Sequence, residues 1–523
     1  MTAIRALRLR ALLLAPLVAA AGCTDLTETP SSAITPENFF GNEAEVLGGL
    51  AGVYAPLRDG VLWNYYNLSQ VTTDEMIVPT RGPDWFDNGR WLELHRHAWG
   101  PTSPSGLDDI QGMWIVPYSG IARANVLLEA LDRVDIPGEA GIRGELHTLR
   151  AFYYYMLMDM FGGAPIATTT EITARPRATR TELFDFIESE LLAARLDLPL
   201  TRPAAEHGRL TRGAADAILA NMYLNAGVFR RDAGVSANSY NSCSGVTLQD
   251  GRGACVAAVA FADTILNSGV YQLADTFAKN FRHDNHLSPE NIFVAKNLNA
   301  DGLGLNFVMR ALHYEQFNPT PWNGFSALAA TYNAFDADDE RRNIFLIGQQ
   351  VHMETGVPVC ERPGCAAGGA PLVFTDTIGN ETNARENEGS RILKWPPDPN
   401  HLNEHNSNDF AFFRLGEIYL IKAEALNELT ANDPNALLLL NQLRARAFDP
   451  DEPLIAPVTR DLILQERLFE LTGEAKRRQD LIRHGRFTAA WEFKAAGGDH
   501  LILMPIPQTQ IDANPELVQN PGY

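Results

Sequence analysis

Helical periodicity in two separate blocks is the feature that most restricts the fold of this 523-residue chain. Apolar residues recur at every third or fourth position in six segments, which are residues 110–134, 141–166, 181–199, 210–227, 412–429 and 462–487. This spacing places the apolar side chains on one face of a helix. Short connections that contain Gly or Pro separate several of these segments. The pattern predicts a mainly α protein built from helical pairs, similar to a tetratricopeptide stack but without a strict repeat.

The stretch between the two blocks has a different composition. Residues 230–410 are rich in Gly, Asn, Pro and Asp, and they contain only short candidate strands at 291–296 and 391–395. Such a composition predicts an irregular, loop-rich subdomain. The sequence therefore divides into an N-terminal helical part (37–229), the loop-rich subdomain (230–410) and a C-terminal helical part (411–523), which follow two further segments at 1–22 and 23–36.

The beginning of the chain has the pattern of an export signal. Three arginines precede an apolar run at residues 11–21, which is too short for a permanent transmembrane helix. The run leads to Ala20-Ala21-Gly22-Cys23, which resembles a bacterial lipobox, where the cysteine thiol receives a lipid. The alternative is an ordinary cleaved signal followed by an incidental cysteine. We therefore expect residues 1–22 to be a lipoprotein signal peptide. Residues 23–36 would then be a polar tether, lipidated at Cys23, that anchors the mature chain to a membrane.

The charge of the chain argues against one class of partner. The sequence has 43 basic and 64 acidic residues, a net charge of −21. A strongly acidic surface repels phosphate backbones, so nucleic acid is not expected as a partner.

Four further cysteines are expected to form disulfides, because an exported chain passes through an oxidising compartment. Three pairings can be drawn, and the local pairs Cys243–Cys255 and Cys360–Cys365 are favoured because each brackets a Gly-rich insert. A metal site is the alternative, but these spacings do not resemble a zinc framework. The acidic stretch at residues 335–340 lacks a calcium-loop pattern. No metal or other cofactor is predicted.

Several segments, taken in order, resemble the SusD/RagB family of outer-membrane lipoproteins. They include "IARANVLLEAL" (121–131), "LRAFYYYMLMDMFGGAPI" (149–166), "FRLGEIYLIKAEALNEL" (413–429), "QERLFELTGEAKRRQDLIRHG" (465–485) and "NPELVQNPGY" (514–523). The resemblance extends from Cys23 to Tyr523. It implies a non-enzymatic protein on the exterior of the outer membrane, which captures an oligosaccharide and delivers it to a SusC-like TonB-dependent barrel. It also implies a tetratricopeptide-like helical scaffold.

Two aromatic loops are the candidate glycan site, because flat aromatic faces stack on the apolar faces of sugar rings. Trp85, Phe86 and Trp91 lie among Gly, Pro and acidic residues, where a core strand is not expected. The second loop supplies Tyr314 and Trp322. The polar candidates for sugar hydroxyl groups are Asp84, Asp87, Asn88 and Asn323. The alternative is that these aromatics only anchor loops, as Tyr153, Tyr154 and Tyr155 are expected to fill the core.

Three rival functions share parts of this pattern. "HLNEH" at 401–405 matches the H-x-x-E-H pattern of some zinc proteases, but the prolines before it predict a loop rather than the required helix. A glycosidase needs two carboxylates across a cleft, and nothing in the sequence indicates such a pair. The charged residues of 466–480 are expected to form ion pairs between helices. A RagB-type peptide-binding protein would have the same fold and remains the main alternative.

Overall fold

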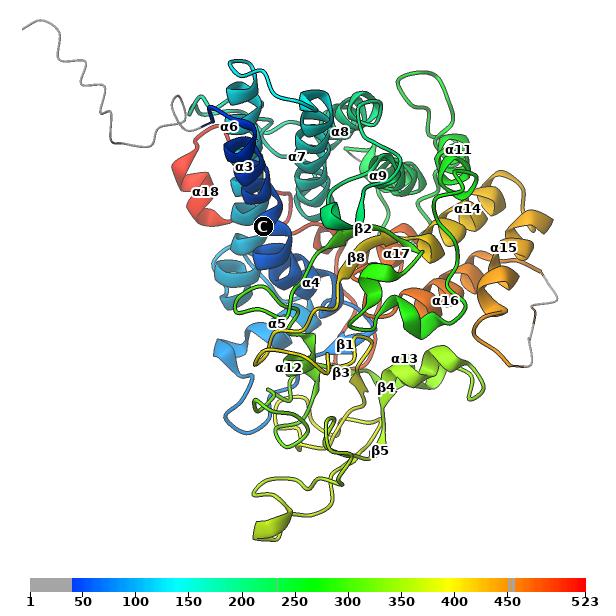
Figure 1. The fold of residues 1–523 in the computed structure, drawn as a ribbon. Helices are drawn as coiled ribbons and strands as arrows, with labels where there is room; N and C mark the ends of the chain where they lie inside the picture. The colour runs from blue at the N-terminus through cyan, green and yellow to red at the C-terminus, as the bar shows by residue number, and fades with distance from the viewer. Residues whose placement is uncertain (1–39, 233, 450–452, 454–456) are drawn as a thin grey trace, which may run out of the picture.

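The computed structural model of the protein describes residues 40–232, 234–449, 453 and 457–523. The predicted signal peptide (1–22), the tether (23–36) and Cys23 lie outside the described residues. The described part is mainly helical, as predicted (Figure 1). Its longer helices are α3 (Glu43–Pro56), α4 (Leu62–Gln70), α6 (Gln111–Leu131), α7 (Glu139–Phe161), α8 (Arg180–Ala194), α9 (Arg212–Leu224), α11 (Ala254–Leu266), α14 (Leu415–Leu429), α15 (Pro434–Arg444) and α16 (Arg460–Leu471). The shorter ones are α5 (Arg90–Arg96), α10 (Ala226–Phe229), α12 (Phe307–Ala311), α13 (Ala329–Ala334), α17 (Arg477–Arg483) and α18 (Gln508–Ala513).

The strands are short and pair antiparallel across long sequence separations. The pairs are β1 (Met76–Ile77) with β3 (Ser326–Ala327), β2 (Asn291–Ala295) with β8 (Phe410–Arg414), β4 (Phe345–Leu346) with β7 (Arg391–Ile392), and β5 (Gly348–Gln349) with β6 (Val373–Phe374). β2 and β7 fall within the two segments expected to form strands. Two of these pairs, β1 with β3 and β2 with β8, tie the loop-rich part to the helical body, since β1 and all of β8 except Phe410 lie outside residues 230–410.

Local sequence signals set where several helices begin and end. Thr179 and Glu182 form a reciprocal capping box at the start of α8. Asp433 caps α15, and Pro434 occupies its first turn, where no backbone donor is needed. α7 ends at Gly162, whose φ of 78° is unfavourable for residues with a side chain.

Consecutive helices pack against one another through the helical body. α3 packs on α6, α6 on α7 and α7 on α8, while α9, α11 and α14 form a second packed series (Figure 1). α11 lies within the span predicted to be irregular, and its alanine-rich sequence allows close packing between α9 and α14. The three consecutive tyrosines of α7 are buried, as expected, and Tyr153 donates to the carbonyl of Val53 (2.6 Å).

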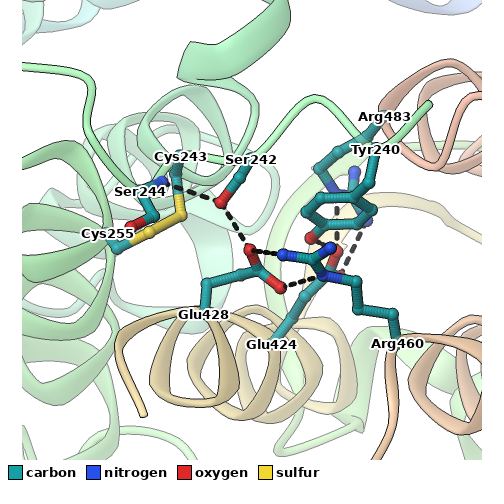
Figure 2. Close-up of a disulfide and its surroundings, with 9 residues drawn as sticks. All are labelled: Tyr240, Ser242, Cys243, Ser244, Cys255, Glu424, Glu428, Arg460 and Arg483. Carbon is teal, nitrogen blue, oxygen red and sulfur yellow. Dashed lines mark hydrogen bonds and ion pairs between the residues drawn. A yellow bond between two sulfur atoms is a disulfide. The ribbon is translucent and has the colours of Figure 1, made fainter. Parts of the chain in front are cut away.

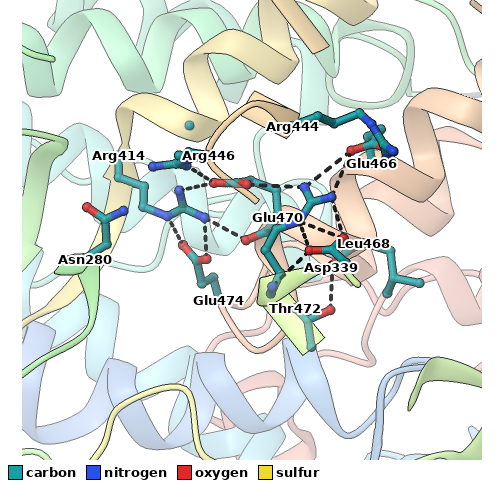
Figure 3. Close-up of polar contacts among 12 residues, drawn as sticks. Asn280, Asp339, Arg414, Arg444, Arg446, Glu466, Leu468, Glu470, Thr472 and Glu474 are labelled. Carbon is teal, nitrogen blue, oxygen red and sulfur yellow. Dashed lines mark hydrogen bonds and ion pairs between the residues drawn. The ribbon is translucent and has the colours of Figure 1, made fainter. Parts of the chain in front are cut away.

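A buried cluster of charged side chains joins the loop-rich part to the C-terminal helices (Figure 3). Arg414, at the end of β8, donates to Glu470 (2.6 Å) and to both oxygens of Glu474 (2.7 Å each). Glu470 also contacts Arg446 and Arg341. The remaining members, each beside an opposite charge, are Glu290, Asp339, Lys394, Arg444 and Glu466. The prediction of structural ion pairs in the 466–480 segment is confirmed.

The cysteines form the two local pairs favoured from the sequence, Cys243–Cys255 and Cys360–Cys365. The first pair joins the loop before α11 to the first turn of that helix (Figure 2). In the same loop, Tyr240 donates to Glu424 (2.7 Å), which also accepts from Arg483. The loop is therefore attached to the helical body by a covalent link and by buried polar contacts.

We expect the double variant Cys243→Ala/Cys255→Ala to lower the free energy of unfolding by about 3 kcal/mol. The reason is that the disulfide joins residues 12 positions apart and so restricts the unfolded chain. Urea denaturation under non-reducing conditions measures this change. Cys360→Ala/Cys365→Ala is the matched control, since its pair spans only 5 residues of an exposed loop and should cost less. Equal losses in the two double variants would contradict the expectation.

No helix among the described residues combines the length and the apolar character needed to cross a membrane.

Candidate functional site

Three loop segments and parts of the helices α4 and α5 surround a cavity of about 1220 Å³ whose walls are rich in aromatic rings. One wall is the loop between β1 and α5, a second wall is the segment that follows α12, and residues 102–108 complete the lining. The cavity is lined by Trp63, Pro83, Asp84, Trp85, Asp87, Asn88, Arg90, Trp91, Thr102, Pro104, Leu107, Asp108, Tyr314, Thr320, Pro321 and Trp322. We call this cavity the aromatic cleft.

The backbone of the first loop is held in an unfavourable conformation. Trp85, Asp87 and Asn88 have φ values of 62°, 38° and 57°. Asn and Asp tolerate this left-handed region, but a tryptophan there is strained. Such strain persists only where surrounding contacts enforce it, and it concentrates at binding and active sites.

The contacts of Trp85 explain how the strained loop is held. Its indole Nε1 donates to the carbonyl of Trp322 (2.6 Å), which links the two walls. Its ring packs edge-on against Trp91 and Phe325, with centroids 5.3 and 5.7 Å apart. Gly324 lies directly against the ring, because a Cβ atom added there would be 2.4 Å from it. Trp85 is therefore a fixed, half-buried platform.

The carboxylates of Asp84 and Asp87 accept hydrogen bonds from the aromatic side chains of the cleft. Tyr314 donates its hydroxyl to Asp84, and Arg362 stacks over the Tyr314 ring at 3.7 Å. Burial and the hydrogen bond to Asp84 both raise the pKa of Tyr314, so its phenol stays neutral. Asp87 accepts from the indole of Trp91 (2.7 Å).

One cation, Arg90 at the beginning of α5, is part of the cleft lining. Arg90 is ion-paired with Asp108 and stacks over Trp91 at 4.3 Å. The lining thus presents three carboxylates and one guanidinium. This arrangement suits an uncharged, hydroxyl-rich ligand better than an anionic one.

Seven of the nine predicted ligand-binding residues line this cleft: Asp84, Trp85, Asp87, Asn88, Trp91, Tyr314 and Trp322. Trp91 is fully buried, so it supports the wall more than it offers a face. Phe86 is 58 % exposed and is not part of the lining.

The prediction for Asn323 needs correction. The side chain is fully buried, accepts from Arg391 (2.8 Å) and donates to the carbonyl of Glu386 (3.1 Å). It holds the second loop in place and cannot reach a ligand. The sequence interpretation also missed Trp63 and Arg90, because Trp63 lies in the helix α4 and Arg90 begins α5.

The HLNEH motif forms a loop, as its prolines predict. Leu402 and His405 are paired in a tight turn, His401 contacts Glu354, and His405 accepts from the amide of Gly302. The two histidines therefore have separate partners. No group of three His, Cys, Asp or Glu residues in the described ranges could hold a metal ion.

Known proteins resemble this chain over most of its length. Residues 372–523 match the SusD family model, and residues 60–224 match a model described as "Starch-binding associating with outer membrane". The SusD-like protein P25 of Formosa agariphila is 25 % identical and covers 95 % of this chain and 96 % of its own. The starch-binding protein SusD of Bacteroides thetaiotaomicron is 24 % identical over 88 % of this chain and 85 % of its own.

Solved structures show the same fold. A laminarin-binding SusD-like protein superimposes with a TM-score of 0.71 at 22 % identity, over 92 % of this chain and all of the other. Surface glycan-binding protein A from Bacteroides thetaiotaomicron, solved in complex with laminarihexaose, gives a TM-score of 0.70 at 21 % identity, over 92 % of this chain and 99 % of its own. The matched segments, the end-to-end relatives and the shared helical fold identify the chain as a member of the SusD/RagB family, a non-catalytic group of binding proteins.

Proposed function

We propose that the protein is a cell-surface lipoprotein that binds an oligosaccharide in the aromatic cleft and delivers it to a SusC-like TonB-dependent barrel in the outer membrane. The observation that carries this proposal is the fixed pair of loops that places Trp85, Tyr314 and Trp322 around one cavity. Sugar rings stack on such faces, while Asp84, Asp87 and Asn88 offer hydrogen bonds to hydroxyl groups. The relatives named for starch, laminarin or glycan binding support the same ligand class.

Calorimetric titration against a panel of ligands tests the binding step. The panel contains neutral α- and β-glucan oligosaccharides, an acidic oligosaccharide, and peptides of mixed sequence. We expect a neutral oligosaccharide to bind and the acidic one to bind more weakly, because the cleft carries an excess of carboxylates. Binding of peptides alone would replace the glycan proposal with the RagB-type function.

Gentle solubilisation of the outer membrane from the native host tests the delivery step. A tagged copy of the protein should co-purify with a large TonB-dependent barrel in stoichiometric amount. If no barrel co-purifies in several mild detergents, the proposed partnership is wrong even if the cleft binds a glycan.

We expect Cys23→Ala to release the protein from the outer membrane, because a lipid on that thiol would supply the membrane attachment. Fractionation of cells that express the variant measures this release, and Thr24→Ala is the neighbouring control that should stay attached. A Cys23→Ala protein that still sediments with the outer membrane would contradict lipid anchoring as the main attachment.

A further inference from the structure

A second cavity, of about 620 Å³, lies between the beginning of α8, the end of α7 and the C-terminal segment. It shares no lining residue with the aromatic cleft. Three arginines line it, Arg177, Arg180 and Arg231. We call it the arginine pocket.

Within the described residues, Arg180 is a buried cation that forms no ion pair, although, against the larger effect of burial, the more distant charges of Asp159 and Asp232 raise its pKa. Arg180 is only 5 % exposed, and its Nε atom has no hydrogen-bond acceptor. Among the described residues its guanidinium contacts the ring of Phe229, with 5.2 Å to the centroid, but forms no ion pair. The nearby Asp159 is bound to Arg478 (2.9 Å). Burial lowers the pKa of Arg180 to about 10, which still leaves it charged at neutral pH.

Arg177 adds a second positive charge to the arginine pocket. Arg177 donates to the carbonyls of Phe161 (2.5 Å) and Gly163 (2.8 Å) and to the side-chain oxygen of Asn520 (2.5 Å). All of these acceptors are neutral, so the charge of Arg177 is solvated but not cancelled. The acidic residues of the lining are exposed and form no ion pair with Arg177 or Arg180; they are Asp232, Asp499 and Glu516.

A buried charge that forms no ion pair costs several kcal/mol, which a bound anion would offset. The size and lining of the pocket indicate a ligand larger than an inorganic ion. Val235, Leu503 and Val518 form apolar walls beside the arginines. We propose that the arginine pocket binds a small organic anion, with an oxyanion head group on Arg180 and Arg177 and an apolar body against these walls.

Fluorescence titration with anilinonaphthalene sulfonate, an organic anion with an apolar body, tests the proposal on the full mature chain. Phenylnaphthylamine, which has a similar apolar body and no charge, is the comparison probe. We expect the sulfonate to bind the wild type and Arg180→Gln to weaken this binding at least about tenfold, the loss typical of one charge-assisted hydrogen bond. Binding of the neutral probe should not change. Benzoate, but not benzyl alcohol, should displace the sulfonate from the wild type.

Two further variants make the test specific. Val518→Glu places a carboxylate in the pocket at a residue that is 71 % exposed, so it should fold normally and lose sulfonate binding. Arg486→Gln removes an exposed arginine that pairs with Asp461 and should bind like the wild type. Equal sulfonate affinity in Arg180→Gln, Val518→Glu and the wild type would overturn the proposal. Equal displacement by benzoate and benzyl alcohol would also overturn it, because the head group would then not be recognised.

Discussion

Glu470→Gln is expected to lower the free energy of unfolding by about 3–5 kcal/mol, the usual cost of removing one charge from a buried ion cluster. The carboxylate is fully buried and contacts three guanidinium groups, those of Arg414, Arg446 and Arg341. The amide keeps the shape of the side chain but leaves these cations short of one negative charge. Urea denaturation followed by circular dichroism measures the change.

Asp461→Asn is the control for this prediction. Asp461 also pairs with an arginine, Arg486, but both side chains are largely exposed. An exposed pair contributes at most about 1 kcal/mol, so this variant should stay close to the wild type. If Glu470→Gln were no less stable than Asp461→Asn, the buried cluster would not be a main support of the fold.

Because of the same cluster, the stability of the fold should depend on pH in a defined direction. Burial alone would raise the pKa of Glu470, but Arg446, Arg414 and Arg341 outweigh it and hold the pKa far below its usual value. Because the folded pKa is lower than the unfolded one, of about 4.3, the stabilisation is complete above that pH and declines in more acidic solution. The wild type should therefore lose stability below about pH 4, and Glu470→Gln should lose less over the same range.

The helical body could be predicted from the sequence because helix formation depends on local spacing, caps and stops. The ion cluster could be predicted only in part. The 466–480 segment indicated ion pairs, but Arg414, Arg341 and Glu290 reach Glu470 or its neighbours only through the tertiary fold. Nothing local marks those three residues as partners.

The aromatic cleft shows the same division between local and distant information. Loop composition indicated Trp85 and Trp322, and their hydrogen bond joins segments 237 positions apart. Asn323 lies in a loop with the composition of a ligand-binding site, yet its side chain is hydrogen-bonded to the buried Arg391. Trp63 was missed because its place in α4 resembles that of a core residue. Only the packing of the loops distinguishes these cases.

Trp85→Ala should weaken binding of the preferred oligosaccharide at least about 30-fold, because a fixed aromatic platform at the centre of a site contributes 2 kcal/mol or more. Its neighbour Phe86 is exposed and outside the cleft lining, so Phe86→Ala should bind like the wild type. Gly324→Ala tests whether the position of the Trp85 ring matters when the tryptophan itself is kept. The new methyl group would force the Trp85 ring to move from its place. It should reduce affinity although every aromatic residue is retained.

Calorimetric titration of the three variants, with thermal melts to check folding, measures these effects. Equal losses in Trp85→Ala and Phe86→Ala, or none in either, would show that the glycan binds elsewhere, because only one of these neighbouring rings faces the cleft.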